Sequence, residues 1–265
     1  MPFLVLLPPS EGKAAVAEGA PVELASLSLP GLTPARERVL DALVELCRGD
    51  EETAAEVLGL SKGLRGEVAR NAGLRSAPAL PAGELYTGVL YDALGLAKLD
   101  EAGYARAERS LLVFSGLWGA VRLGDRIPAY RCSGGVKLPP LGALGAYWRR
   151  ATADVLPAEA GADGLVLDLR SSAYAASWKP AGAVVERTAT VRVLQEKDGK
   201  RSVVSHFNKA TKGRLVRDLL NSGAEPETPG ELLDVLRGLG YLVEVAAQGT
   251  ARKAWQLDVV VTEIH

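Results

Sequence analysis

The clearest pattern along the chain is a set of short apolar runs, each followed by polar residues. Three such runs are Phe3–Leu7, Leu111–Phe114 and Gly164–Leu169. Uniformly apolar runs of this length are typical of strands buried on both faces. The first run leads into Ser10-Glu11-Gly12-Lys13, and the third leads into Arg170-Ser171-Ser172. Polar residues just past a buried strand are a common place for a ligand site, although an ordinary turn has the same composition.

Helices are expected between and after these strands, where apolar residues recur at helical spacing. The first is expected to begin with Thr33 as its N-cap and Pro34 as its first helical residue. The others are expected at Glu51–Leu58, Ser61–Asn71, Val89–Leu96, Glu101–Arg109, Leu144–Val155, Asn208–Leu220 and Glu231–Leu239.

Two hairpins are expected in the last third of the chain. Val184–Val193 and Val203–Phe207 are predicted as strands joined through Asp198-Gly199, because Asp-Gly suits a two-residue turn. Tyr241–Val245 and Trp255–Thr262 are predicted as a closing hairpin. Together these elements predict an α+β (mixed α/β) fold. It is expected to form a single compact domain over residues 1–265, with a central mixed sheet and surrounding helices.

Composition narrows the classes of function. The 265 residues are 48% hydrophobic and carry a net charge of −1, so any nucleic acid must be bound by a local basic patch. Cys47 and Cys132 have no CxxC spacing, and no ligands cluster around His206 or His265. We therefore expect a reducing compartment, no metal site and no cofactor. The first apolar run lacks a charged leader, and no run is long enough to span a membrane, so a cytoplasmic protein is expected.

The segment Phe114–Pro140 is rich in glycine, proline and cations. Its start, Phe114-Ser115-Gly116-Leu117-Trp118-Gly119, has the pattern of the hairpin in a helix-hairpin-helix element, whose backbone N–H groups lie on DNA phosphates. A tight strand-to-helix turn with glycines for packing explains the same residues. Further on come Arg122, Asp125, Arg126, Tyr130, Arg131 and Lys137. They predict either a binding loop or a loop held by salt bridges.

A second basic segment, Lys200–Arg217, contains no acidic residue. Lys209 and Lys212 are neighbours on the predicted helix, whereas Arg214 and Arg217 lie on a different side. A basic helix start attracts phosphate, but surface lysines and arginines also occur without a partner. Thr87, before the helix at Val89, is either a plain cap or a hydroxyl offered to a bound anion.

Several residues near the strand ends are candidates for catalysis. They are Ser10, Lys13, Asp125, Ser171, Tyr174 and His206. A serine beside Lys179 could form a nucleophile-and-base pair, but the chain has no GxSxG, SxxK or Walker spacing. Ordinary loop polarity accounts for the same residues, so the sequence does not decide whether the protein is an enzyme.

Five blocks, in order, give the chain a resemblance to a known family. The blocks are PPSEGK (8–13), GELYTGVLYDAL (83–94), FSGLWGAVRLGDRIPAYR (114–131), VLDLRSSAY with SWKP (166–180) and VVSHFNKATKGR (203–214). Over nearly its whole length the chain resembles the YaaA family of peroxide-stress proteins. The resemblance implies a cytoplasmic protein that limits oxidative DNA damage when peroxide meets free iron. It also implies a compact mixed α/β fold with a helix-hairpin-helix element and a basic cleft that binds duplex or distorted DNA.

By this resemblance, the hairpin consists of Ser115, Gly116, Leu117 and Gly119. By the same resemblance, the cleft consists of Lys13, Arg122, Arg131, Lys137, Lys179, Lys209, Lys212 and Arg214. Thr87 is a further candidate phosphate contact from its position before the helix at Val89. Here Glu11 stands close to Lys13, which sets the first block apart from a purely cationic one.

Two functions follow from these residues. One is sequence-independent binding of DNA. The other is an enzyme or binder acting on a nucleotide or another phosphorylated small molecule, because a phosphate-backbone patch needs no mixture of hydroxyls, carboxylate and imidazole. An enclosed pocket would favour the small molecule, whereas an open groove about 20 Å wide would favour DNA.

Overall fold

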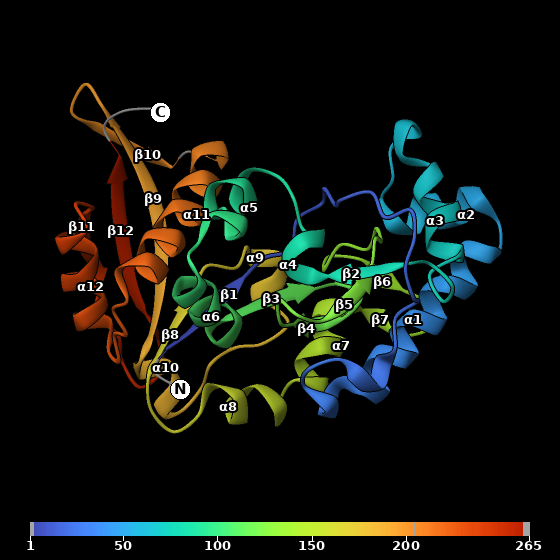
Figure 1. Ribbon diagram of the computed structural model, residues 1–265, viewed down its shortest axis with the longest axis horizontal. Helices are drawn as coiled ribbons and strands as arrows, with labels where there is room; N and C mark the ends of the chain where they lie inside the picture. Colours follow the sequence, from blue (N-terminus) through green and yellow to red (C-terminus); the bar gives the residue numbers. More distant parts are fainter. Residues whose placement is uncertain (1–2, 204, 262–265) are drawn as a thin grey trace.

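The apolar run at the start of the chain forms β1 (Phe3–Leu7), whose five residues are all buried. β1 lies between β3 (Leu111–Ser115) and β8 (Leu165–Asp168) and pairs in parallel with both. The three predicted buried strands are therefore confirmed, and they form the middle of the sheet in Figure 1. The computed structural model describes residues 3–203 and 205–261.

Within the described residues the main sheet is mixed and has eight strands. Their order is β11–β12–β9–β8–β1–β3–β4, and β10 pairs with β9. The other strands of this sheet are β4 (Gly119–Val121), β9 (Thr188–Lys197), β10 (Lys200–Val203), β11 (Leu242–Ala247) and β12 (Trp255–Val261). Two small sheets pair β2 (Ala79–Pro81) with β5 (Arg126–Pro128), and β6 (Lys137–Leu138) with β7 (Gly142–Ala143).

The connections around β1 reverse direction. From β1 the chain reaches β3 on one side, and it then crosses back to β8 on the other side before continuing to β9. In parallel pairing, Leu7 is opposite Val113 and Leu6 is opposite Asp168, so these strands end at one edge of the sheet. Between β1 and β8 the sheet thus has a topological switch point, where open α/β sheets leave a crevice at the carboxyl ends of their strands.

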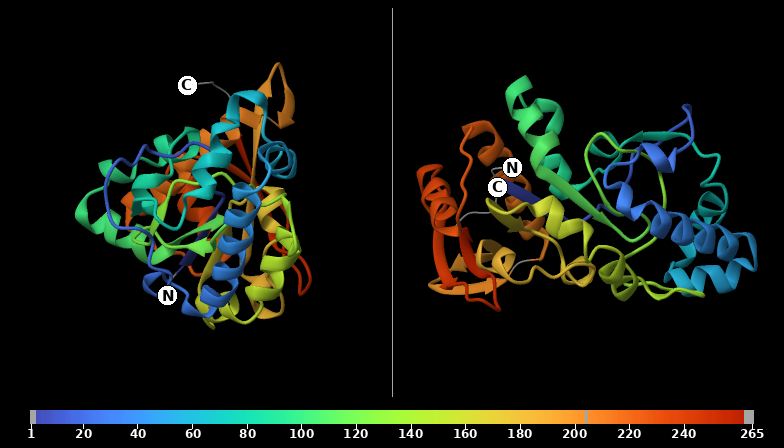
Figure 2. Two further views of the ribbon diagram at one scale, coloured as in Figure 1. Left: turned by 90° about the vertical axis from the view of Figure 1, so that its right-hand side faces the viewer. Right: turned by 90° about the horizontal axis from the view of Figure 1, so that it is seen from below.

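Helices cover both faces of the sheet. They are α1 (Thr33–Arg48), α2 (Glu51–Leu58), α3 (Gly66–Ala72), α4 (Ala82–Leu85), α5 (Val89–Leu94), α6 (Glu101–Ser110), α7 (Leu144–Ala151), α8 (Val155–Ala160), α9 (Ser172–Ala175), α10 (Ala183–Glu186), α11 (Ser205–Ser222) and α12 (Pro229–Gly238). Figures 1 and 2 show α1–α3 at one end of the molecule and α12 with β11 and β12 at the other.

Alternation along the central strands divides the core in two. Val5 and Leu7 of β1 belong to the larger buried cluster, which includes Leu215 and Leu219 of α11. Leu6 points the other way, into a smaller cluster with Trp178 and Leu156 of α8. Successive residues of a strand face opposite sides, so a strand buried on both faces must be apolar throughout, as this one is.

Several element boundaries differ from the predictions. The stretch expected as one strand from Val184 contains α10 before β9 begins at Thr188. The expected strand Val203–Phe207 is instead the end of β10 followed by the start of α11. Asp198 and Gly199 do form the predicted turn, with φ of 52° and 71°. Because this turn is only two residues long, it places Lys200 directly opposite Lys197 and starts the returning strand at once.

Two helices also differ from the predictions. α1 begins at Thr33 itself, preceded by Leu32, without a side-chain cap, so Thr33 is not the N-cap. The helix expected over Leu144–Val155 ends at Ala151 as α7. After a turn at residues 152–154, α8 begins at Val155.

The prediction that residues 114–119 form the hairpin of a helix-hairpin-helix element is wrong. Ser115, Gly116 and Gly119 form the tight connection between β3 and β4, which pair antiparallel, and all three residues are buried. A Cβ added at Gly116 would lie 2.4 Å from the Cys132 carbonyl oxygen, and one at Gly119 would lie 2.6 Å from the Trp148 ring. The glycines are therefore required for close packing inside the protein, and their backbone cannot lie on an external phosphate.

Candidate functional site

A cavity of about 330 Å³ opens at the carboxyl ends of β1 and β8. Four separate segments form its walls: the loop after β1, the start of α5, the segment after β8 and the first turns of α11. Its polar lining comes from Ser10, Glu11, Ser171, Tyr174 and Lys209, and its apolar lining includes Pro8, Pro9, Val89 and Leu90. The cavity therefore lies at the switch point of the sheet, and we call it the switch-point cavity.

Four of the predicted site residues meet in this cavity. Ser10, Ser171, Tyr174 and Lys209 come from positions far apart in the sequence and line it together. Thr87 is adjacent, because its Oγ1 lies 3.2 Å from where a Cβ at Gly12 would be. The fold thus places these five residues close together, at the carboxyl ends of β1 and β8.

The loop after β1 is fixed against the segment before α5. Ala14 donates a backbone hydrogen bond to Leu85 O at 2.8 Å, and Thr87 N donates to Gly12 O at 3.3 Å. The Tyr91 hydroxyl donates to Pro8 O at 2.8 Å. These contacts hold two walls of the cavity in register with each other.

Tyr174 forms another wall and is held by the glycine-rich segment. Its hydroxyl accepts a hydrogen bond from Gly134 N at 3.2 Å. Burial raises the pKa of Tyr174 to about 12, and the Glu11 carboxylate adds to the increase. The phenol therefore keeps its proton at neutral pH and remains a hydrogen-bond donor.

Lys13 lies directly behind the cavity wall. Its Nζ donates to Ser10 O at 2.9 Å and lies 4.2 Å from the centroid of the Tyr130 ring. Burial lowers the pKa of Lys13 to about 8, Glu11 opposes this shift, and Arg131 adds to it. The amine is thus charged in only part of the molecules near pH 8.

A chain of buried hydroxyls lies below Lys13. Ser115 Oγ is 2.6 Å from the Tyr130 hydroxyl, which is 2.9 Å from the Tyr86 hydroxyl. Ser115 Oγ also accepts from the backbone N–H groups of Leu117 and Trp118. Ser115 therefore fixes the turn after β3 and does not face solvent.

The structure keeps other predicted site residues apart from the cavity. Arg122 forms an ion pair with Glu159, and Arg131 forms one with Glu11 at 3.1 Å. The Asp125 carboxylate accepts from the backbone N–H groups of Ser28 and Arg122, at 2.7 and 2.9 Å. The contacts of Asp125 hold it in a turn. Together with the two ion pairs, they favour the second of the two alternatives that the sequence allowed for this segment, a loop held by salt bridges.

The remaining candidates lie at scattered positions. Lys137 is exposed on β6, and Lys179 is exposed in the loop after Trp178. His206 lies in the first turn of α11, but its side chain is outside the part of the structure that is described. None of these three residues is among the described residues that line the switch-point cavity.

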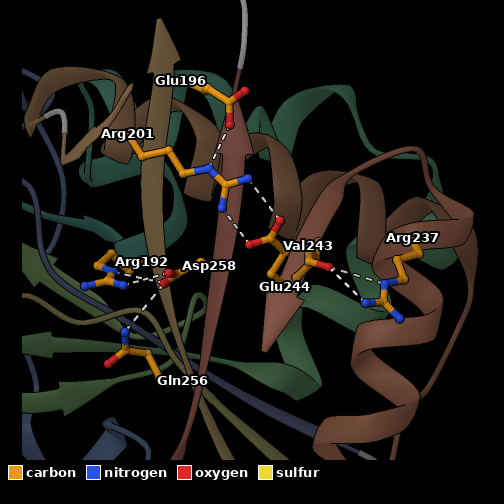
Figure 3. Close-up of polar contacts among 8 residues, drawn as sticks. All are labelled: Arg192, Glu196, Arg201, Arg237, Val243, Glu244, Gln256 and Asp258. Carbon is orange, nitrogen blue, oxygen red and sulfur yellow. Dashed lines mark hydrogen bonds and ion pairs between the residues drawn. The ribbon is translucent and has the colours of Figure 1, made fainter. Parts of the chain in front are cut away.

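The second basic segment is divided among three places. Arg201 donates to Glu196 and to Glu244, as Figure 3 shows, beside the pair of Arg192 and Asp258. Arg214 lies on the side of α11 near Tyr241, where it opposes the rise in the pKa of that phenol. Only the first turns of α11 reach the cavity, so the sequence overestimated the extent of this basic surface.

Lys212 lies beside the end of β8. Its Nζ is 3.5 Å from Leu169 O, and burial lowers its pKa while Asp168 opposes the shift. On the same turns of α11, Asn208 Oδ1 and Thr211 Oγ1 are buried without a hydrogen-bond partner among the described residues. Buried polar atoms of this kind are uncommon, so this end of α11 carries unused hydrogen-bonding capacity next to the cavity.

Sequence reasoning missed the aromatic residues around the site. Tyr86 and Tyr91 were not among the predicted site residues, and Tyr130 was named only as part of the loop that follows Arg122. These tyrosines nevertheless hold Lys13 and the loop after β1 in place. The signal was present, because Tyr86 and Tyr91 both stand in the block GELYTGVLYDAL. Residues five positions apart lie on different faces of a helix, so the sequence does not predict a contact between these two tyrosines. The bend at Gly88 lets their rings stack, with 5.4 Å between the ring centroids.

The described part of the chain holds neither a group of metal ligands nor a membrane-crossing helix. In these ranges, no three or more His, Cys, Asp and Glu side chains are grouped so that they could hold a metal ion. No helix of residues 3–203 and 205–261 combines the length and apolar character needed to cross a membrane.

The sheet topology and the cavity define the class: an α+β protein whose cavity opens at the carboxyl ends of parallel strands. The family model described as peroxide stress protein YaaA matches residues 3–246. Because this match covers nearly the whole chain, the protein belongs to the YaaA family of peroxide stress proteins. The resemblance found in the sequence is confirmed.

Similar proteins support the same assignment. The chain is 69% identical over 263 residues to a UPF0246 protein of Streptomyces coelicolor, covering 99% of this chain and 100% of that protein. It is 47% identical over 249 residues to a UPF0246 protein of Corynebacterium efficiens, covering 92% and 95% of the two chains. A UPF0246 protein of Corynebacterium glutamicum is 38% identical over 246 residues, with 91% and 95% covered.

Proposed function

We propose that the switch-point cavity binds a phosphorylated small molecule of about the size of a mononucleotide. The observation that supports this proposal is the convergence of Ser10, Ser171, Tyr174 and Lys209 on one cavity at the carboxyl edge of the sheet. A volume of about 330 Å³ falls in the range of small-ligand sites.

The lining suits a ligand with one apolar part and one anionic part. Val89, Leu90 and two prolines offer an apolar wall on which a base or a similar planar group can pack. The hydroxyls of Ser10, Ser171 and Tyr174 match polar substituents such as those of a sugar. The exposed ammonium of Lys209, in the first turns of α11, complements a phosphate.

Binding of duplex DNA, which the family resemblance implies, has less support from the geometry. The predicted hairpin is buried, and two of the expected cleft cations, Arg122 and Arg131, form ion pairs with carboxylates. A duplex about 20 Å wide also cannot enter a cavity of this size. Binding of duplex DNA is therefore the alternative outcome in the experiment that tests the proposal.

Isothermal titration calorimetry tests the proposal with a panel of nucleoside monophosphates, the same nucleosides without phosphate, and a short DNA duplex. Lys209→Ala is the test variant, and Lys137→Ala is the matched control because Lys137 is exposed but lies outside the cavity. Loss of one charge-assisted hydrogen bond predicts an affinity for the monophosphate about 10- to 100-fold weaker in Lys209→Ala. Lys137→Ala should bind normally.

Two results would contradict the proposal. One is the absence of binding by any monophosphate at millimolar concentration. The other is binding of the duplex alone, weakened equally in both variants and falling steeply with salt, which is the behaviour of a phosphate-backbone contact. ³¹P NMR of the same mixtures reports whether a bound phosphate is also turned over.

A further inference from the structure

Lys13 also lines a second cavity, distinct from the switch-point cavity. This cavity measures about 260 Å³, and its walls include Arg70, Pro78 and Ala129. Lys13 therefore separates two cavities: its Nζ is bonded to the loop of the first, and the residue forms a wall of the second. Lys13 lines the second cavity but is not among the described residues that line the switch-point cavity.

The amine of Lys13 has few partners. Among the described residues it has one hydrogen-bond acceptor, Ser10 O at 2.9 Å, and it lies 4.2 Å from the centroid of the Tyr130 ring. The Tyr86 ring is farther away, at 5.5 Å. Within the described ranges, no carboxylate forms an ion pair with Lys13. An ammonium carries three N–H donors, so these protein contacts satisfy only part of the hydrogen-bonding capacity of the half-buried Lys13.

The neighbouring charges are already paired with each other. Glu11 forms an ion pair with Arg131, and Glu67 forms one with Arg70. Each nearby carboxylate thus sits beside an arginine. Glu11 and Glu67 still favour the ammonium form of Lys13, whereas Arg131 disfavours it. The remaining titratable groups around it are the phenols of Tyr86 and Tyr130 and the thiol of Cys132, whose pKa burial raises to about 12. These three groups are neutral near pH 7, so none of them stabilises an ammonium as an anion would.

We propose that Lys13 is a nucleophilic amine that condenses with a small aldehyde or ketone in the second cavity. The neutral nitrogen attacks the carbonyl carbon, a C–N bond forms, and the carbonyl oxygen leaves as water, giving an imine. Both protons of that water come from the amine nitrogen, directly or through solvent, and no oxidant or reductant is needed. Lysines activated for such chemistry are typically desolvated or placed beside another cation, and Lys13 is half-buried and lies near Arg131.

The charge state of Lys13 is consistent with this role. With its pKa lowered to about 8, about one Lys13 amine in ten is neutral at pH 7. For an ordinary lysine the neutral share at that pH is below about one in a thousand. The hydroxyl chain of Ser115, Tyr130 and Tyr86 holds the two rings in place beneath the amine.

Reductive alkylation of the full-length protein tests the proposal. Acetaldehyde and cyanoborohydride at pH 7 would trap the imine, and peptide mass spectrometry would give the rate at each lysine. We expect Lys13 to react at least about tenfold faster than the exposed Lys179 and Lys209, because of its larger neutral share. Its rate should level off above about pH 8, whereas the rates of the exposed lysines should still rise.

Lys212 is an internal control. Burial lowers its pKa too, but it lies beside Asp168 and lines neither cavity. If Lys212 reacted as fast as Lys13, burial alone would explain the reactivity and the proposal would be overturned. A rate at Lys13 no higher than at exposed lysines would overturn it as well.

Two variants separate reactivity from folding. Lys13→Arg keeps the cation and should keep the circular dichroism spectrum, but should abolish the fast alkylation. Tyr130→Phe keeps the ring beneath the amine, so fast alkylation at Lys13 should persist. If alkylation of Tyr130→Phe fell to the rate of exposed lysines while its spectrum stayed unchanged, the role assigned to the ring would be refuted.

Discussion

Gly213 sets the distance between the two helices that border the switch-point cavity. A Cβ added there would lie 2.2 Å from Leu90 O of α5 and 2.9 Å from Ala93 Cβ. Lys209, one turn earlier on α11, and Leu90 both line the cavity. We therefore predict that Gly213→Ala destabilises the protein and changes the shape of the cavity.

The expected loss of stability in Gly213→Ala can be estimated from the contact between the added Cβ and Leu90 O. To reach an ordinary separation, α5 and α11 must move apart by about 1 Å. Overpacking of this kind costs up to about 3 kcal/mol, and the better helix propensity of alanine returns about 1 kcal/mol. The net loss is about 2 kcal/mol, which lowers Tm by roughly 4–8 °C in a protein of this size.

Urea unfolding and differential scanning calorimetry measure this loss. Gly230→Ala is the matched control, since Gly230 also lies in a helix but the nearest atom to an added Cβ is Thr228 Oγ1, at 3.9 Å. The control should be unchanged or stabilised by up to about 1 kcal/mol. If Gly213→Ala were as stable as the control, or if it bound the ligand of the cavity with unchanged affinity, the reasoning from helix contact to cavity shape would be refuted.

Three further predictions concern stability. Arg36→Met should cost about 3–5 kcal/mol in urea unfolding, because the fully buried Arg36 donates to three backbone carbonyls, those of Ser28, Trp118 and Ala120; a loss below about 1 kcal/mol would contradict this. Asp50→Ala should lower Tm measurably, since Asp50 accepts from Thr53 N at the start of α2; an unchanged Tm would show that the cap contributes nothing. For Lys13, the folded-state pKa of about 8 lies below the unfolded value of 10.5, so the unfolded chain binds more protons between these pH values. Wild type should therefore gain stability relative to Lys13→Met as pH rises from 8 to 10.5, and a difference that stays constant with pH would argue against burial of the amine.

Some parts of the fold could be predicted because the pattern has a single physical explanation. The run FLVLL is apolar at every position, and only a strand covered on both faces requires that. Asp198-Gly199 has positive φ at both residues, and these residue types tolerate that conformation best. In both cases local sequence and final structure agree.

The conformation of the glycine-rich segment Phe114–Pro140 could not be predicted in this way. The spacing of Gly116 and Gly119 fits a hairpin between helices as well as one between strands, because both need a tight turn. The decision came from Cys132 and Trp148, which approach the two glycines from elsewhere in the chain. Likewise a glycine inside a helix normally weakens that helix, and only the approach of α5 explains why position 213 is glycine.

The sequence by itself determined the family, the buried strands and most of the polar residues that follow them, since these depend on residue types and their order. The tertiary structure decided which of those residues share a site. Ser10 and Lys209 meet because parallel strands end at one edge and α11 packs there, whereas Arg122 and Arg131 are drawn into ion pairs with Glu159 and Glu11. A cation in a sequence shows only its charge, and whether that charge is available to a ligand depends on which carboxylate the fold places beside it.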